Sequence, residues 1–150
     1  MLTRRFLLGA LTAVLFAPAV KAQDMPVFYA TDGAAVAGYD VVSYFSGNAP
    51  VLGRPEYAVV WKGAEWQFAS AENRDAFERN PHAFAPQFGG YCAYAMAHGK
   101  LKSTEPTLWG VVDGRLYLTH SPEVEEMWRE ATAEYISMAE MYWPGILYEQ

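Results

Sequence analysis

The residues with the clearest chemical potential are Cys92 and Met96, which stand four positions apart. If residues 91–97 form the short helix that their alanine content favours, with Gly99 ending it, the thiol and the thioether share one helix face. Two soft donors at this spacing suit copper(I), and the alternative is that both side chains fill the core. His98 lies on another face of such a helix and joins a site only if the helix frays before it.

A second set of candidates begins at Asp40, which follows Tyr39 in an aromatic segment. Its carboxylate is a candidate ligand, or an acid with a raised pKa, but an aspartate in this setting more often closes a turn through local hydrogen bonds. Gly89 and Gly90, followed by Tyr91, indicate a turn or a place where another stretch of backbone comes close. We expect these five residues to form a ligand-binding or structural motif.

Catalytic motifs are missing from the sequence. It contains no Gly-x-Ser-x-Gly nucleophile elbow, no phosphate-binding loop and no dinucleotide fingerprint. A cysteine–histidine hydrolase needs a group that orients the pair, and no spacing in the chain provides one for Cys92. The sequence therefore predicts a protein that is not an enzyme.

A β-hairpin followed by a helix is predicted ahead of Cys92. Residues 57–61 and 64–68 have the composition and alternation of two strands, and Lys62–Gly63 forms a two-residue turn between them. Ser70 is a helix N-cap residue, and the helix that it begins runs to about Arg79, where an Asn-Pro dipeptide stops it.

The same order of elements returns later in the chain. Residues 109–112 and 115–118 indicate strands around an Asp113–Gly114 turn, and Ser121 then caps a helix with Pro122 in its first position. Apolar residues spaced three and four apart give that helix one continuous stripe: Val124, Trp128, Ala131, Tyr135, Met138 and Tyr142. We predict a small single α+β domain with two β-hairpins, each followed by a helix, and with a long C-terminal helix.

The first 22 residues have the order of an export signal. Two arginines precede an apolar stretch at 6–16, and a cleavage site is expected after Ala22. The arginine pair resembles a twin-arginine (Tat) signal, although the general secretory (Sec) route fits equally well. The apolar stretch is shorter than the roughly 20 residues that span a bilayer. We therefore expect a periplasmic or secreted protein with no membrane span after cleavage, the alternative being a retained N-terminal anchor.

Cleavage leaves a tether at 23–37 and one domain at 38–150. The signal carries three of the eleven basic residues and none of the acidic ones, so the mature chain keeps eight basic and seventeen acidic residues, a net charge of −9. Such a chain repels nucleic acid and anionic membranes and attracts cations or a basic partner. With one cysteine it has no internal disulfide, so packing must stabilise it.

Three segments together resemble the exported branch of the YHS-domain proteins: Gly-Tyr-Asp-Val-Val-Ser-Tyr-Phe at 38–45, the stretch 66–84, and 85–95 with 112–118. The resemblance implies a small α+β fold and a link to metals. YHS modules and related treble-clef-like modules accompany copper transporters and bind metal through cysteines.

This chain departs from that cysteine pattern. Ser43, Ala69 and Asn73 stand at the three cysteine positions, so the usual metal site does not carry over.

The leading hypothesis is a periplasmic YHS-type binding protein that handles a metal ion, with copper as the best candidate. Its ligands would be Cys92, Met96 and His98. The alternative is a non-metal protein-interaction module of the bacterial envelope that docks a partner through an aromatic surface. The expected partners are thus a metal ion or an envelope protein, and nucleic acid is not expected to bind.

Overall fold

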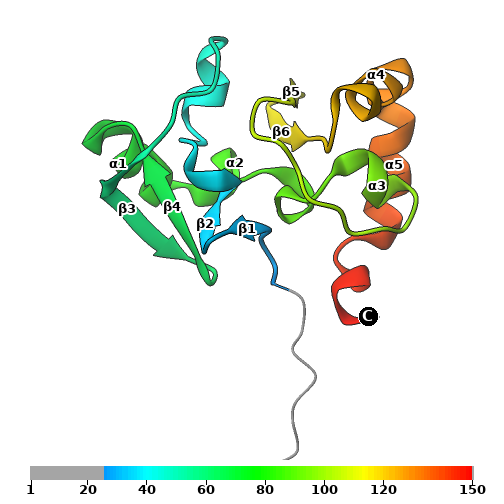
Figure 1. The fold of residues 1–150 in the computed structure, drawn as a ribbon, viewed down its shortest axis with the longest axis horizontal. Helices are drawn as coiled ribbons and strands as arrows, with labels where there is room; N and C mark the ends of the chain where they lie inside the picture. The colour runs from blue at the N-terminus through cyan, green and yellow to red at the C-terminus, as the bar shows by residue number, and fades with distance from the viewer. Residues whose placement is uncertain (1–25, 150) are drawn as a thin grey trace, which may run out of the picture.

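The computed structural model describes residues 26–149, so the predicted export signal at 1–22 lies outside the described residues. Figure 1 shows two groups of elements side by side, one built on a sheet and the other on a small hairpin with the C-terminal helices. No helix within residues 26–149 is long and apolar enough to cross a bilayer.

The first group is built on a four-stranded sheet with the order β1-β2-β4-β3. β3 (Arg54–Trp61) and β4 (Ala64–Phe68) form the antiparallel hairpin that the sequence predicts. The two turn residues have positive φ, of 48° and 80°, which is the backbone of a type I′ turn. Alternate residues of β4 are buried, so the ring of Trp66 enters the core.

The other two strands come from the segment predicted as a tether. β1 (Ala30–Thr31) and β2 (Ala34–Ala35) pair with each other, and β2 pairs in parallel with β4. Phe28 is buried, with its ring centroid 5.0 Å from that of Trp66. Residues 26–37 therefore belong to the folded domain, because their apolar side chains complete one edge of the core.

Helices cover this sheet. α1 (Ala71–Arg79) begins as predicted at Ser70, whose Oγ accepts a 3.2 Å hydrogen bond from the backbone N–H of Asn73. α2 (Pro81–Phe84) follows at once. Phe77 of α1 stacks on the ring of Trp66 with centroids 5.1 Å apart, which fixes the helix against the sheet. Two short 3-10 helices, η1 (Val36–Gly38) and η2 (Ser43–Ser46), complete the group.

The second group begins with the second predicted hairpin. β5 (Trp109–Val112) and β6 (Arg115–Leu118) are antiparallel, and their turn residues again have positive φ, of 50° and 72°. α4 (Pro122–Glu130) starts at Ser121, whose Oγ accepts a 3.3 Å hydrogen bond from the backbone N–H of Val124. The sequence predicts both the Asp113–Gly114 turn and the Ser121 cap.

The helix after Ser121 does not run unbroken to Tyr142, as the apolar stripe had suggested. At Ala131 the backbone adopts φ −149° and ψ 50°, and a separate helix, α5 (Thr132–Tyr142), begins. The Thr132 hydroxyl donates a 2.9 Å hydrogen bond to the Trp128 carbonyl. This side-chain bond replaces a helical backbone bond at the break, and apolar spacing carries no information about it.

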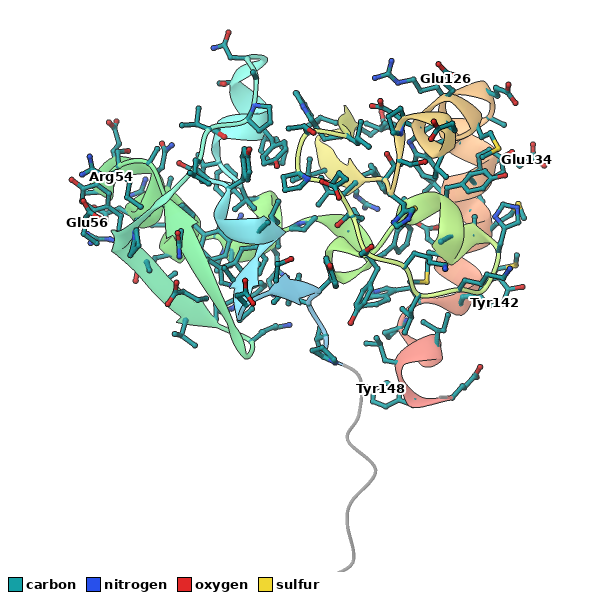
Figure 2. The ribbon with its side chains drawn as sticks, in the orientation of Figure 1. Arg54, Glu56, Glu126, Glu134, Tyr142 and Tyr148 are labelled. Carbon is teal, nitrogen blue, oxygen red and sulfur yellow. The ribbon has the colours of Figure 1, made fainter. Side chains whose placement is uncertain are left out.

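Between the hairpins, η3 (Gln87–Gly90) packs against β6 and α3 (Ala93–Ala97), and α3 packs against α5. η4 (Gly145–Tyr148) follows α5. Figure 2 shows Glu126 and Glu134 pointing away from the body of the protein. The structure confirms the predicted small α+β domain with two hairpins, each followed by a helix, and a long C-terminal helix.

Candidate functional site

A cavity of about 310 Å³ opens beside α3 and reaches the buried Cys92. We call it the thiol pocket. α3, the loop that leaves it, and the start of α4 all contribute to its walls. Its lining consists of Cys92, Tyr94, Ala95, His98, Lys100, Lys102, His120 and Val124.

Cys92 is the N-cap residue of α3 and is 0% exposed. Its side chain forms no cap hydrogen bond to the first turn of α3. Burial raises the pKa of the Cys92 thiol, and the nearby backbone N–H groups of Ala95, His120 and Tyr94 oppose this in part because they favour the thiolate.

Two imidazoles share the pocket, and each is held at Nδ1 by a backbone carbonyl. Nδ1 of His98 lies 2.8 Å from the carbonyl oxygen of Tyr94, and Nδ1 of His120 lies 3.0 Å from that of Ser103. A carbonyl oxygen only accepts hydrogen bonds, so these contacts favour the tautomer with the proton on Nδ1 in both rings. At His120 the Ser103 hydroxyl also lies 3.1 Å from Nδ1. In the neutral ring, Nε2 is left with its lone pair.

His98 reaches the pocket because α3 ends at Ala97, one residue before it. This is the fraying that the sequence required for His98 to join Cys92. His120 precedes the cap of α4 and arrives through the tertiary fold, beyond anything its spacing indicated.

Met96 keeps the predicted one-turn spacing from Cys92, since its backbone N–H donates a 2.9 Å hydrogen bond to the Cys92 carbonyl. Its side chain, however, lies in the buried cluster that includes Phe88 and Ala139 and is not part of the pocket lining. Within residues 26–149, no group of three or more His, Cys, Asp or Glu side chains is placed to hold a metal ion.

Two lysines give the thiol pocket a positive rim. Lys100 and Lys102 are exposed, and neither forms an ion pair with a carboxylate in the described part of the chain. The Lys102 carbonyl accepts a 3.0 Å hydrogen bond from the backbone N–H of Cys92, which holds this loop against α3. A thiol, two imidazoles and positive charge thus meet in an otherwise acidic protein.

Asp40 is fully buried, and its carboxylate accepts three hydrogen bonds. Oδ1 accepts one of 2.9 Å from the Val42 N–H, which is the local turn closure that the sequence favoured. Oδ2 accepts one of 2.9 Å from the Ala69 N–H and one of 2.7 Å from the side-chain amide of Asn73. Asp40 therefore joins the segment before η2 to the start of α1.

The three positions at which the YHS resemblance places cysteines all contact Asp40. The Ser43 hydroxyl donates a 2.6 Å hydrogen bond to the Asp40 carbonyl, and Ala69 and Asn73 donate to its carboxylate. A metal there would need lone-pair donors such as thiolates. These residues instead present hydrogen-bond donors, so they do not fit a metal.

The remaining predicted site residues hold the fold together. Gly89 has φ of +62°, and a Cβ there would collide with the Val27 carbonyl, which confirms the predicted close approach of backbone. The Gly89 carbonyl accepts a 2.8 Å hydrogen bond from the Tyr29 N–H, and the Tyr91 hydroxyl donates one of 2.8 Å to the Pro26 carbonyl. These contacts fasten the N-terminal segment to η3.

Tyr39 and Gly90 also make structural contacts. Tyr39 forms an isolated antiparallel bridge with Leu52, and the Gly90 carbonyl accepts a 2.7 Å hydrogen bond from the Thr104 hydroxyl. Neither residue lines the thiol pocket.

Sequence reasoning missed Lys100, Lys102 and His120 as members of the site. They stand in two loops, at spacings that match no ligand motif, and only folding brings them to Cys92. No family model, no curated protein and no solved structure matches this chain, so the resemblance to YHS-domain proteins stays a prediction.

Proposed function

We propose that the protein is an exported binding module of the YHS type, that it is not an enzyme, and that it binds copper(I) in the thiol pocket. The donors are the Cys92 thiolate and Nε2 of His120. The observation that carries the proposal is that one pocket holds a thiol together with two imidazoles, each with its Nδ1 within 3.0 Å of a backbone carbonyl oxygen. This outer contact is typical of metal-ligating histidines, because it orients the ring and fixes its tautomer.

His120 is the preferred nitrogen donor because Ser103 holds its Nδ1 with two atoms, the carbonyl oxygen at 3.0 Å and the hydroxyl at 3.1 Å, which orients the ring. His98 lines the same pocket and serves as the matched comparison.

The chemistry suits a soft ion. Thiolate selects copper(I), and imidazole is a good ligand for copper. The thiol loses its proton when metal binds, so binding and deprotonation are coupled. Tyr94, Ala95 and Val124 provide apolar wall beside these donors and limit the access of water.

The test is a titration of the mature protein with copper(I) against a chromogenic chelator, beside Cys92→Ser, His120→Gln, His98→Gln and Met96→Leu. We expect Cys92→Ser to abolish competition. His120→Gln should weaken it by at least the roughly 10- to 100-fold that loss of an outer-shell partner costs, and by more than His98→Gln does.

Met96→Leu nearly conserves volume and should leave the affinity unchanged, which separates this site from a Cys92–Met96 pair. Equal competition by the wild type and Cys92→Ser rules the proposal out. Elemental analysis of protein purified from its own periplasm adds a direct check on bound copper.

The alternative is a protein-interaction module of the bacterial envelope. It is supported by exposed apolar side chains near the C-terminus, with Met141 at 75%, Tyr142 at 43% and Tyr148 at 67% exposure. Figure 2 labels both tyrosines on this side of the molecule. A partner that co-purifies at near-stoichiometric yield with the wild type, and not with Met141→Ser, would favour this alternative, provided that Cys92→Ser retains the partner.

A further inference from the structure

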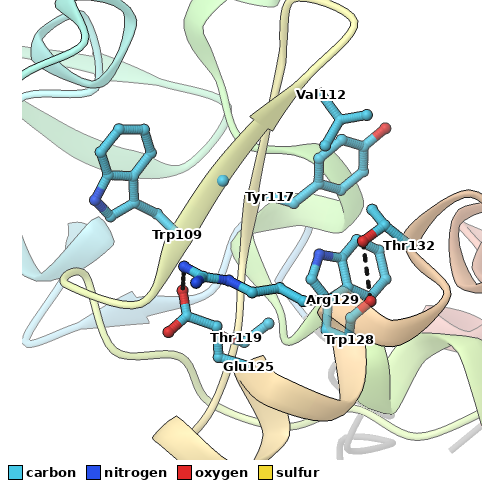
Figure 3. Close-up of a pocket in the computed structure, with 9 residues that line it drawn as sticks. Trp109, Val112, Tyr117, Thr119, Glu125, Trp128, Arg129 and Thr132 are labelled. Atoms are coloured by element: carbon cyan, nitrogen blue, oxygen red, sulfur yellow. Dashed lines mark hydrogen bonds and ion pairs between the residues drawn. The ribbon is translucent and has the colours of Figure 1, made fainter.

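A second cavity, of about 200 Å³, lies between β5 and α4 and is separate from the thiol pocket in its lining residues. We call it the aromatic pocket. Figure 3 shows two indole rings and a phenol ring around it, with an ion pair at one side. Its lining consists of Trp109, Gly110, Val112, Tyr117, Thr119, Glu125, Trp128, Arg129 and Thr132.

Gly110 leaves this space open from within strand β5. Its φ is outside the left-handed region, and a Cβ built on it would meet nothing within 4 Å. The backbone therefore does not require glycine here, and a strand-interior glycine often marks a place where a ligand comes close. Gly110 pairs with Tyr117, so a side chain at 110 would project onto the face that carries the Tyr117 ring.

The polar side of the aromatic pocket is an ion pair within α4. Nη2 of Arg129 lies 2.8 Å from Oε1 of Glu125. The Glu125 side chain is only 18% exposed, whereas that of Arg129 is 69% exposed. The carboxylate thus belongs to the pocket wall, and the guanidinium reaches it from the solvent side.

The unequal exposure decides which charge a ligand should carry. An anion would draw Arg129 away and leave the half-buried Glu125 carboxylate without its partner, which is unfavourable. A cation would take over the carboxylate and release Arg129 into water, and the loss of an exposed ion pair is small. Aromatic ring faces also attract cations, and the net charge of the mature chain is negative.

We propose that the aromatic pocket binds a small organic cation of the quaternary ammonium class, which replaces Arg129 at Glu125 and contacts the rings of Trp109, Tyr117 and Trp128. Arg129 then acts as a built-in competitor for the site. This site is independent of the thiol pocket, so copper binding has no part in it.

The experiment adds tetramethylammonium chloride to the ¹⁵N-labelled mature protein and follows the tryptophan indole N–H signals by NMR, with sodium chloride keeping the ionic strength constant. We expect saturable shifts at Trp109 and Trp128. Trp61 and Trp66, which do not line the aromatic pocket, should not shift. tert-Butanol, an uncharged molecule of similar shape, should bind far more weakly.

Three variants test which groups of the aromatic pocket bind the cation. Glu125→Gln and Gly110→Val should abolish binding, the first by removing the charge and the second by filling the space, and valine in a strand should leave the fold intact. Arg129→Ala should tighten binding about two- to five-fold, because it removes the competitor.

The proposal is overturned if wild-type indole signals show no saturable shift, or if Arg129→Ala weakens binding. Equal binding of tert-butanol and tetramethylammonium would also overturn it. Far-UV and near-UV circular dichroism of each variant shows whether a lost shift reflects the site or the fold.

Discussion

The side-chain amide of Asn73 donates a 2.7 Å hydrogen bond to Oδ2 of Asp40, across 33 positions of sequence. With the Ala69 N–H at 2.9 Å from the same oxygen, it ties the 38–45 segment to the first turn of α1. Ala69 and Asn73 stand at two of the positions where the YHS resemblance places cysteines. The buried Asp40 carboxylate and its hydrogen-bond donors join these two segments.

The first prediction concerns this network. Asp40→Ala leaves three donors unpaired and opens a cavity, so we expect it to lower the free energy of unfolding by about 3 kcal/mol or more. Asp40→Asn keeps the shape but turns an N–H₂ group toward donors, and should cost about 1–3 kcal/mol. Urea denaturation measures both. The exposed Asp75→Ala is the control and should change stability by less than about 1 kcal/mol; an equal effect of Asp75→Ala and Asp40→Ala would contradict the assigned role.

The second prediction concerns alkaline pH. Tyr44 is buried, and its hydroxyl donates a 2.7 Å hydrogen bond to the Pro106 carbonyl. Burial, with smaller contributions from Tyr39 and Asp40, raises the pKa of Tyr44 above its ordinary value of 10.0. Above that pH the unfolded chain loses the phenol proton while the folded chain keeps it, so the free energy of unfolding falls as pH rises from about 10.

Tyr44→Phe should make that fall shallower, because phenylalanine does not titrate. At neutral pH the same variant should be less stable by about 1 kcal/mol, since it lacks the hydrogen bond. Urea denaturation at pH 8 and at about pH 11 measures both effects. An identical loss between the two pH values in wild type and variant would show that Tyr44 does not carry this dependence.

The third prediction links copper affinity to protons. Burial raises the pKa of the Cys92 thiol, so the thiol is protonated at neutral pH and must release its proton to bind copper(I). The apparent dissociation constant should therefore fall by about tenfold for each unit of pH between roughly 7 and 8. Chelator competition at several pH values measures it. An affinity that does not change over this range would mean that the thiolate is not the ligand.

The fourth prediction concerns the contact between the N-terminal segment and η3. Gly89 has positive φ, and a Cβ there would overlap the Val27 carbonyl, whereas Gly47 has φ of +78° with nothing within 4 Å. Gly47→Ala should cost only the backbone strain, about 1 kcal/mol, and Gly89→Ala should cost at least about 2 kcal/mol more. Thermal unfolding of the pair compares them directly. Equal shifts would mean that the 26–29 segment does not pack on Gly89.

Local signals account for the parts of the fold that were predictable. A two-residue turn, a serine cap and period-two alternation each act within a few residues, so both hairpins and the starts of α1 and α4 followed from the sequence. The break at Ala131 did not, because the rings of Trp128 and Tyr135 remain stacked, 6.1 Å apart, across it. The apolar spacing reflects this ring stacking, and it carries no information about the backbone conformation at Ala131.

The candidate site was predictable only at its centre. Cys92 and His98 stand close in sequence, whereas His120 reaches the pocket through the second hairpin and the two lysines through the loop after α3. No periodic pattern relates such segments, since their contact depends on how α4 packs on α3. The place of Phe28 in the core was hidden for the same reason, because its partner Trp66 lies in a distant strand.

Cys92 lines the thiol pocket, yet it is 0% exposed, which affects the rate of its reactions as well as their equilibria. A reagent that reacts with its sulfur, whether an alkylating agent or a metal ion, must wait for the groups that cover it to move, so the protein sets the rate. Alkylation and copper loading would then share one limiting rate that stops rising with reagent concentration. That shared plateau would measure the rate at which the structure around Cys92 moves.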